Sequence, residues 1–138
     1  MMNNEELIKA ALEARKSSYS PYSGYKVGAA LYNKDGRIIK GCNVENASYG
    51  LSNCAERTAV FKAVSEGLRD FEAIAIVGGK EEGDDTGDFA YPCGACRQVL
   101  REFCYPDTFK VIVARSVNDY REHTLSELLP ESFGPENL

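Results

Sequence analysis

Residues 53–61 read NCAERTAVF and residues 92–100 read PCGACRQVL. In both stretches a cysteine opens a segment whose apolar residues recur at helical spacing, so we predict helices over 54–66 and 94–103. A glycine follows the first of these segments, at the position where a left-handed helix cap is common. Each predicted helix therefore carries a thiol at its start.

Outward from these helices, the chain alternates between strand-like and helix-like patterns. The apolar run 71–77 predicts a buried strand between the two helices. Before them, the runs 25–32 and 37–44 have strand character and are joined by a short turn in which Gly36 allows a positive φ. We therefore predict a β-hairpin ahead of the first thiol.

The ends of the chain complete the pattern. Two capping-box sequences, Asn3 with Glu6 and Thr124 with Glu127, mark helix starts. Only about five residues separate the last two strand-like runs, too few for a parallel crossover, so we predict that they pair antiparallel. Strands alternating with helices after a hairpin predict an α/β fold with a mixed sheet and helices on its faces. The remaining predicted elements are a helix over 3–17, strands over 109–114 and 120–123, and a short helix over 124–129.

Composition narrows the class of protein. With 138 residues, 43% of them hydrophobic, the chain fits one domain over 1–138. A net charge of -5 and a pI near 5.0 argue against nucleic-acid binding, which needs a basic surface. The N-terminal segment carries early acids and no long apolar run, so we expect no signal peptide, no membrane partner and a cytoplasmic location.

The five cysteines raise the question of their chemistry. An odd number in a reducing compartment argues against a disulfide framework and for metal binding, redox chemistry or buried thiols. Cys93 and Cys96 have the C-x-x-C spacing that zinc sites share with disulfide oxidoreductases. Cys54 favours a metal, because helix N-termini stabilise thiolates and two such ends can meet around one ion.

A fourth protein ligand would make the metal structural, whereas three ligands would leave a place for water. Cys42 lies in a strand pattern, where a small buried residue is the simpler interpretation. Cys104 lies at the far end of its helix, roughly 12 Å along the axis from Cys96. His123 sits in a polar stretch that is typical of the surface. We therefore favour three ligands plus water.

Glu56 is the carboxylate nearest to these thiols in the sequence. Two residues of a regular helix turn about 200°, so Glu56 and Cys54 share a site only if Cys54 occupies the very first position. Taken alone, Glu56 is also a typical first-turn acid. The glycine-rich acidic segment 80–91 has the composition of a solvated loop, and we assign it no chemistry.

The two opening stretches together resemble the C-A-E-R and P-C-G-A-C-R-Q motifs of the small cytidine deaminases, zinc hydrolases that act on free nucleosides. The resemblance extends through SPYSGYKVGAAL, GCNVENASYG, KAVSEG and LLPESFGP, in order. It implies a three-layer α/β/α fold with a central mixed five-stranded sheet. It also implies one Zn²⁺ per subunit and a homotetramer with shared active sites.

The implied reaction is hydrolytic deamination of cytidine and deoxycytidine to uridine and deoxyuridine, with release of ammonia, in pyrimidine salvage. In this family pattern Cys54, Cys93 and Cys96 hold zinc, and Glu56 moves the proton from water to the ring nitrogen and then to the departing amine. Arg57 hydrogen-bonds ligand sulfurs and offsets the negative charge of the thiolates.

The resemblance also implies how a nucleoside is recognised. Asn43 and Glu45 resemble the pair that binds the ribose hydroxyl, where a carboxylate repels phosphate and favours nucleosides over nucleotides. Tyr25 stands where the family usually has phenylalanine beside the base, which keeps an aromatic face but adds a hydroxyl. Phe133 resembles the residue that reaches into a neighbouring subunit's site to stack on the pyrimidine. The remaining implied substrate contacts are Ala55 and Tyr49, and Tyr49 is also a candidate subunit contact.

Three alternatives remain open at this stage. One is a deaminase for another aminopyrimidine nucleoside, such as a blasticidin-type antibiotic. The second is a non-enzymatic, zinc-stabilised interaction module in which Cys42 or Cys104 closes the metal shell. The third is a thiol oxidoreductase that uses Cys93 and Cys96.

Overall fold

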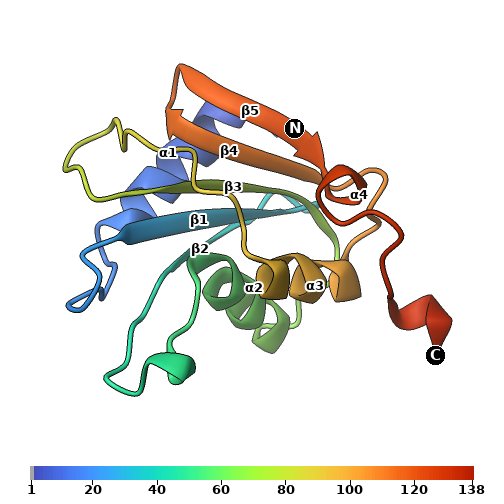
Figure 1. Cartoon of the computed structure of the whole chain (residues 1–138). Helices are drawn as coiled ribbons and strands as arrows, with labels where there is room; N and C mark the ends of the chain where they lie inside the picture. Colours follow the sequence, from blue (N-terminus) through green and yellow to red (C-terminus); the bar gives the residue numbers. More distant parts are fainter. Residues whose placement is uncertain (1) are drawn as a thin grey trace.

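This computed structural model describes residues 2–138. They fold into a mixed sheet with helices on both faces (Figure 1). The helices are α1 (Asn4–Arg15), α2 (Ala55–Ser65), α3 (Gly94–Phe103) and α4 (Leu125–Leu128), with 3-10 turns η1 (Tyr49–Leu51) and η2 (Pro135–Asn137). The strands are β1 (Lys26–Asn33), β2 (Ile38–Cys42), β3 (Phe71–Gly79), β4 (Lys110–Ser116) and β5 (Asp119–Thr124). Every helix and strand that the sequence predicts is present.

The strands of residues 2–138 form a five-stranded sheet in the order β2-β1-β3-β4-β5. The hairpin partners β1 and β2 are antiparallel, as are β1 and β3, while β3 and β4 run parallel. The α3 segment makes the crossover between the two parallel strands. The predicted antiparallel pairing of the last two strands is confirmed for β4 and β5.

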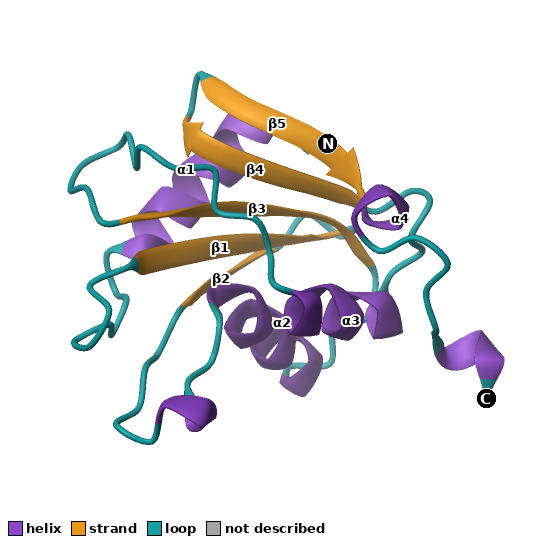
Figure 2. Ribbon diagram, viewed as in Figure 1, coloured by secondary structure: helices purple, strands orange, loops and turns teal. Residues whose placement is uncertain are grey.

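Side chains alternate along the strands and feed two cores, one on each face of the sheet. Leu31, Ile74 and Val111 lie in the core beneath α2 and α3. Their neighbours Ala73 and Ile112 lie in the core beneath α1. Figure 2 shows α1 on one face of the sheet and α2 and α3 on the other. The three-layer α/β/α fold with a mixed sheet is confirmed.

Two glycines let the helices approach the sheet closely. A Cβ at Gly28 would overlap the backbone of α1 at Ala11, and a Cβ at Gly41 would overlap the backbone of α2 at Ala55 and Ala59. Because backbone atoms cannot move aside as a flexible side chain can, both positions require glycine. The contact at Gly41 holds the first turn of α2, whose N-cap is Cys54, against β2.

Strand β2 ends at Cys42, earlier than the predicted end at residue 44. The next residue bonds to the neighbouring chain with both its backbone and its side chain. The Asn43 backbone N–H donates to the Val27 carbonyl (3.2 Å), its Oδ1 accepts from the Val27 N–H (3.0 Å), and its Nδ2 donates to the Tyr25 carbonyl (2.8 Å). An amide side chain offers both a donor and an acceptor, so it can replace one peptide unit of the ladder. These bonds fix Asn43 at the sheet edge, where β2 ends.

Candidate active site

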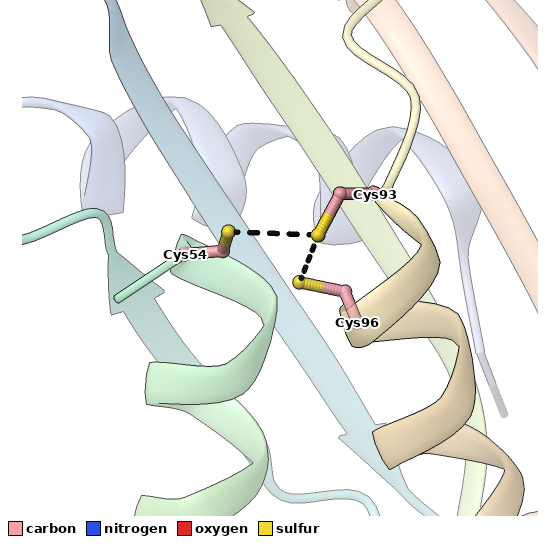
Figure 3. A group of neighbouring side chains, drawn as sticks. All are labelled: Cys54, Cys93 and Cys96. Atoms are coloured by element: carbon pink, nitrogen blue, oxygen red, sulfur yellow. Dashed lines mark hydrogen bonds between the residues drawn. The ribbon is translucent and has the colours of Figure 1, made fainter. Parts of the chain in front are cut away.

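Three thiols meet where the N-terminal ends of α2 and α3 face each other (Figure 3). The Sγ atoms of Cys54 and Cys93 are 3.8 Å apart, those of Cys93 and Cys96 are 3.5 Å apart, and all three lie within 4.8 Å of one another. Cys96 is buried, whereas Cys93 is exposed. The sulfurs thus form one compact cluster that is open to solvent on one side.

Cys54 occupies the very first position of its helix, as it must if it is to share a site with Glu56. Cys54 is the N-cap of α2 with extended backbone (φ -78, ψ 155), and Cys93 is the N-cap of α3 with similar angles (φ -68, ψ 169). Neither thiol caps its own helix by a hydrogen bond. Both sulfurs therefore stay available to a ligand, while the helix N-termini favour their negative charge.

The cluster fits a zinc ion. Tetrahedral zinc with Zn–S bonds of roughly 2.3 Å places its sulfur ligands about 3.8 Å apart, close to the separations that the thiols already have. Zinc requires deprotonated thiols, and the two helix N-termini supply a field that favours thiolate. The donor set and its spacing therefore suit zinc without rearrangement of the backbone.

Within residues 2–138, the cluster contains these three cysteines and no other His, Cys, Asp or Glu. The Cys42 thiol donates to the Ser17 carbonyl (3.4 Å), and Cys104 is buried in the core beside α3. The His123 Nε2 atom lies 3.0 Å from the Tyr91 hydroxyl. Three protein ligands are the number found in catalytic zinc sites, whose fourth position takes water or substrate.

Hydrogen bonds around the three thiols favour the thiolate form of Cys54 before any metal binds. Hydrogen bonds from Cys96 and from Arg57 lower the pKa of Cys54 to about 5. The guanidinium Nη2 of Arg57 lies 3.2 Å from the Cys54 Sγ, and its Nε is buried without a hydrogen-bond partner within residues 2–138. The hydrogen bond to Cys54 and burial raise the pKa of Cys96 in turn. Arg57 is therefore placed to offset the negative charge of a thiolate cluster.

Glu56 lies one residue inside α2 and is only 4% exposed, an unusual position for a carboxylate. Burial raises its pKa to about 7, and the nearby Cys54 thiolate acts in the same direction. A buried carboxyl with a shifted pKa beside a candidate metal cluster is a typical candidate for proton transfer.

A pocket of about 480 Å³ opens in front of these groups. Its volume is in the range that holds a small organic ligand. The residues of the sequence prediction that line it are Tyr25, Asn43, Glu45, Tyr49, Cys54, Ala55, Glu56 and Cys93. Residues from the segment before β1, the loop after β2, η1, the start of α2 and the approach to α3 are thus brought together around one pocket.

Glu45 presents a fixed acceptor at the rim of this pocket. Its Oε1 accepts from the backbone N–H groups of Tyr22 (3.0 Å) and Ser23 (3.1 Å), and the Ser23 hydroxyl donates to its Oε2. The Tyr49 hydroxyl lies 3.5 Å from that same Oε2. These bonds, led by the one from the Ser23 hydroxyl, lower the pKa of Glu45 and keep it ionised.

The end of the acidic segment also lines the pocket, through Phe89, Ala90 and Tyr91. The assignment of the whole segment 80–91 to a solvated loop without a role is therefore wrong for its last three residues. The guanidinium of Arg121 stacks over the Phe89 ring, 3.9 Å from its centroid. An aromatic-x-aromatic pattern just before Cys93 was the available sequence signal, and the charges that precede it obscured it.

Phe133 stands apart from the pocket of its own chain. This residue is 57% exposed and does not belong to the pocket lining. The structure thus brings together all predicted substrate contacts except this one.

Comparison with known proteins agrees with this geometry. The family model described as "Cytidine and deoxycytidylate deaminase zinc-binding region" matches residues 1–113. A cytidine deaminase of Halalkalibacterium halodurans is 54% identical over 99% of this chain and 98% of its own length. One from Sporosarcina psychrophila is 47% identical over 99% and 96%. The crystal structure of cytidine deaminase from Burkholderia pseudomallei superposes with a TM-score of 0.84, at 49% identity, over 96% of this chain and 100% of that one. The chain, with its three-thiol cluster at two helix N-termini, belongs to the cytidine deaminase family.

Proposed function

We propose that this chain catalyses the hydrolytic deamination of cytidine and deoxycytidine to uridine and deoxyuridine, with release of ammonia, as a step of pyrimidine salvage. The observation that carries the proposal is the buried carboxyl of Glu56 beside three clustered thiols at a pocket of about 480 Å³. Family membership and the identity to cytidine deaminases support it.

Zinc, when bound by Cys54, Cys93 and Cys96, supplies the Lewis acidity that brings the pKa of a water molecule toward about 7. Glu56 accepts a proton from the attacking water on its carboxylate. It then delivers that proton to the ring nitrogen beside the amino-bearing carbon. Glu56 next takes the remaining proton from the hydroxyl that has been added to that carbon and passes it to the departing amine, so the carbonyl of the product forms as ammonia leaves. One buried side chain thus serves as base and then as acid.

The pocket rim favours a free nucleoside. Asn43 and Glu45 are our candidates for binding the ribose hydroxyl. The Glu45 carboxylate is held ionised by its donors, so a phosphate on that hydroxyl would meet a like charge. The net charge of -5 also opposes a polynucleotide substrate. Tyr25 and Ala55 are the candidates for contacts with the base.

We also propose that the working form is a homotetramer in the cytoplasm. Large apolar side chains on η1 and α2, among them Tyr49, Leu51 and Phe61, are exposed, as expected of a surface that a second copy covers. Phe133, exposed and outside its own pocket, is our candidate for completing the pocket of a neighbouring copy. Thiolate ligands are best preserved in a reducing compartment. None of the helices in residues 2–138 has the length and apolar character that a membrane span requires.

The test combines metal content and turnover on one purified sample. We expect stoichiometric zinc, loss of cytidine absorbance in the ultraviolet and release of an equal amount of ammonia. Glu56→Gln should keep zinc and fold while deamination is nearly abolished, and Glu66→Gln, on the exposed end of the same helix, should behave as the parent. Blasticidin, assayed in parallel, should be the poorer substrate.

Two results would contradict the proposal. If deamination survives Glu56→Gln, Glu56 is not the proton carrier. If the zinc-replete protein turns over neither cytidine nor deoxycytidine, the interaction-module alternative is favoured. Insulin reduction that withstands a strong chelator would favour the oxidoreductase alternative for Cys93 and Cys96.

A further inference from the structure

The C-terminal arm (residues 129–138) is tied along its length to one helix. From α3, the Arg97 Nη1 donates to the Leu128 carbonyl (2.7 Å), at the root of the arm. The Gln98 Nε2 donates to the Phe133 carbonyl (2.9 Å), in its middle. The third tie comes from Arg101, four residues after Arg97 and hence on the same side of the helix.

Arg101 makes the largest number of these hydrogen bonds to the arm. Its Nε donates to the Ser132 hydroxyl (2.7 Å), and its guanidinium pairs with the Glu136 carboxylate, with Nη1 at 3.3 Å from Oε2. The Arg101 side chain is only 8% exposed, whereas the cations of the other ion pairs within residues 2–138 are 36% exposed or more. A buried guanidinium needs partners for its donors. Ser132 and Glu136 of the arm supply them.

Gly134 makes room for this guanidinium. A Cβ at position 134 would overlap the terminal nitrogens and the central carbon of the Arg101 guanidinium. The Gly134 backbone is extended (φ -147), so its conformation suits any residue and the close approach alone requires glycine. The Gly134 N–H also bonds to the Asn137 Oδ1 (2.8 Å), which closes the last turn. The arm and Arg101 therefore fit together as a pair.

The one large apolar side chain between these ties points to solvent. Phe133 lies between Ser132 and Gly134, yet more than half of this residue is exposed. Fixing a chain segment costs conformational entropy, and here the ordered segment buries little of its own aromatic. In Figure 1 the arm leaves α4 and runs past α3 to the C-terminus, away from the sheet. This arrangement suits an aromatic that is held ready for another molecule.

We propose that Arg101 is a positioning residue that holds the C-terminal arm in place, so that Phe133 enters the pocket of a second copy of this chain. The inference rests on the proposed function, in which neighbouring copies share their sites. The aromatic walls of the pocket, Tyr25, Phe89 and Tyr91, suit an aromatic side chain that closes its open side. The first turn of α3 carries zinc ligands, and Arg101 lies further along the same helix. One helix therefore positions a subunit's own metal site and also the arm that brings Phe133 to the neighbouring subunit.

The primary variant is Arg101→Lys, which keeps the charge but loses the planar fork of donors. Gly134→Ala is the second variant, because it pushes the guanidinium away without touching Arg101. We expect both to keep zinc, melting temperature and oligomeric state near the parent values. The kcat/KM for cytidine should fall about tenfold, the size of one lost aromatic contact. Arg37→Lys, on an exposed ion pair of the β1–β2 hairpin, is the matched control and should change nothing.

Hybrid oligomers separate positioning from general destabilisation. Subunits with Glu56→Gln have intact arms and no chemistry, while Arg101→Lys subunits have intact chemistry and loose arms. Hybrids purified through two different affinity tags should show more activity per Glu56-bearing subunit than Arg101→Lys alone, because the Glu56→Gln copies supply working arms. Hybrids of Phe133→Ala with Glu56→Gln should gain in the same way.

Three results would overturn the inference. The first is a parental kcat/KM in both Arg101→Lys and Gly134→Ala. The second is a gain in the Phe133→Ala hybrids without a gain in the Arg101→Lys hybrids, which would deny Arg101 its role. The third is no gain in either hybrid, which would show that the arm does not act on another copy. Failure of the proposed function is distinct, because the parent protein itself would then leave cytidine unchanged.

Discussion

The sulfur atoms of Cys54 and Cys93 lie 3.8 Å apart although the two residues are 39 positions apart in the chain. The intervening chain runs through α2, crosses the sheet as β3 and returns along the acidic segment to the start of α3. Since each thiol is an N-cap, the contact brings two helix N-termini together. The metal site is therefore a product of the sheet topology, and local sequence alone does not build it.

Removing one of these thiols should cost the metal and the activity together. We expect Cys93→Ser to lower zinc content well below one per chain and to abolish deamination, because a hydroxyl is a poor zinc ligand. Cys104→Ser, which changes a buried thiol outside the cluster, is the matched control and should keep both zinc and activity. Atomic absorption and an ammonia assay on the same samples provide the measurement. Full zinc in the Cys93 variant would contradict the assigned ligand set.

Arg57 should control how tightly the metal is held. Its guanidinium lies 3.2 Å from the Cys54 Sγ, and removal of such a partner typically weakens metal affinity by about 10–100-fold. We therefore expect Arg57→Gln to lose zinc at a lower concentration of a competing chelator than the parent. Lys62→Gln, on the exposed side of the same helix, should titrate like the parent. If both variants lose half of their zinc at the same chelator concentration, Arg57 does not stabilise the thiolate ligands.

The elements of the fold were predictable because their patterns are local. Helical spacing marked α2, and the Thr124 with Glu127 capping box marked α4, where both of its hydrogen bonds are present. At the end of β2 the predicted boundary, residue 44, was wrong, and a side chain bonds to the neighbouring strand there. β2 stops at Cys42, and beyond it the Asn43 side-chain amide bonds to the Val27 N–H and the Tyr25 carbonyl of the neighbouring chain. Those side-chain bonds form only because β1 lies alongside, and a local sequence pattern does not show which strand is the neighbour.

The site divides in the same way. Residues within the two cysteine motifs were identified from spacing and resemblance, and the structure brings Cys54, Cys93 and Cys96 together. Phe89 was missed because its place in the pocket depends on tertiary contacts, with Arg121 of β5 stacked on its ring. An acidic, glycine-rich neighbourhood is typical of a loop, and nothing in its composition shows where the loop ends and the pocket wall begins.

Gly41→Ala should destabilise the protein through the packing of α2 on the sheet. The added Cβ would overlap backbone atoms of Ala55 and Ala59, and overpacking of this kind typically costs about 1–3 kcal/mol or more. Lys9→Ala, at an exposed position of α1, is the control. Thermal unfolding of both variants against the parent gives the comparison. A parental melting temperature for Gly41→Ala would mean that α2 can move away from β2 without loss.

Glu45 should make the stability of the protein depend on acid pH. Hydrogen bonds from Ser23 and Tyr22 lower its pKa in the folded state, so its contribution is complete above the unfolded-state pKa of about 4.3. That contribution is lost as the pH falls through the lowered folded-state pKa. The difference in unfolding free energy between the parent and Glu45→Gln should be constant from neutral pH down to about pH 5 and shrink below it. Urea titrations at several pH values measure it.

The control for this pH series is Glu72→Gln, an exposed carboxyl on β3, which should differ from the parent by a small amount across the whole range. A stability difference for Glu45→Gln that grows on acidification would have the wrong sign. It would show that the Glu45 carboxyl is held protonated in the folded protein, against the donors that surround it.

Tyr25 gives a prediction that separates its ring from its hydroxyl. Tyr25 lines the pocket, while burial and the Asp88 carboxylate of the acidic segment raise the pKa of its hydroxyl. We expect Tyr25→Phe to change kcat/KM for cytidine by less than about threefold, because the aromatic face remains. Tyr25→Ala should raise KM about tenfold through the lost contact with the base. Steady-state kinetics on zinc-replete samples measure both. A Tyr25→Phe variant as impaired as Tyr25→Ala would mean that the hydroxyl itself contacts the substrate, and Asp88 would then be the next residue to substitute.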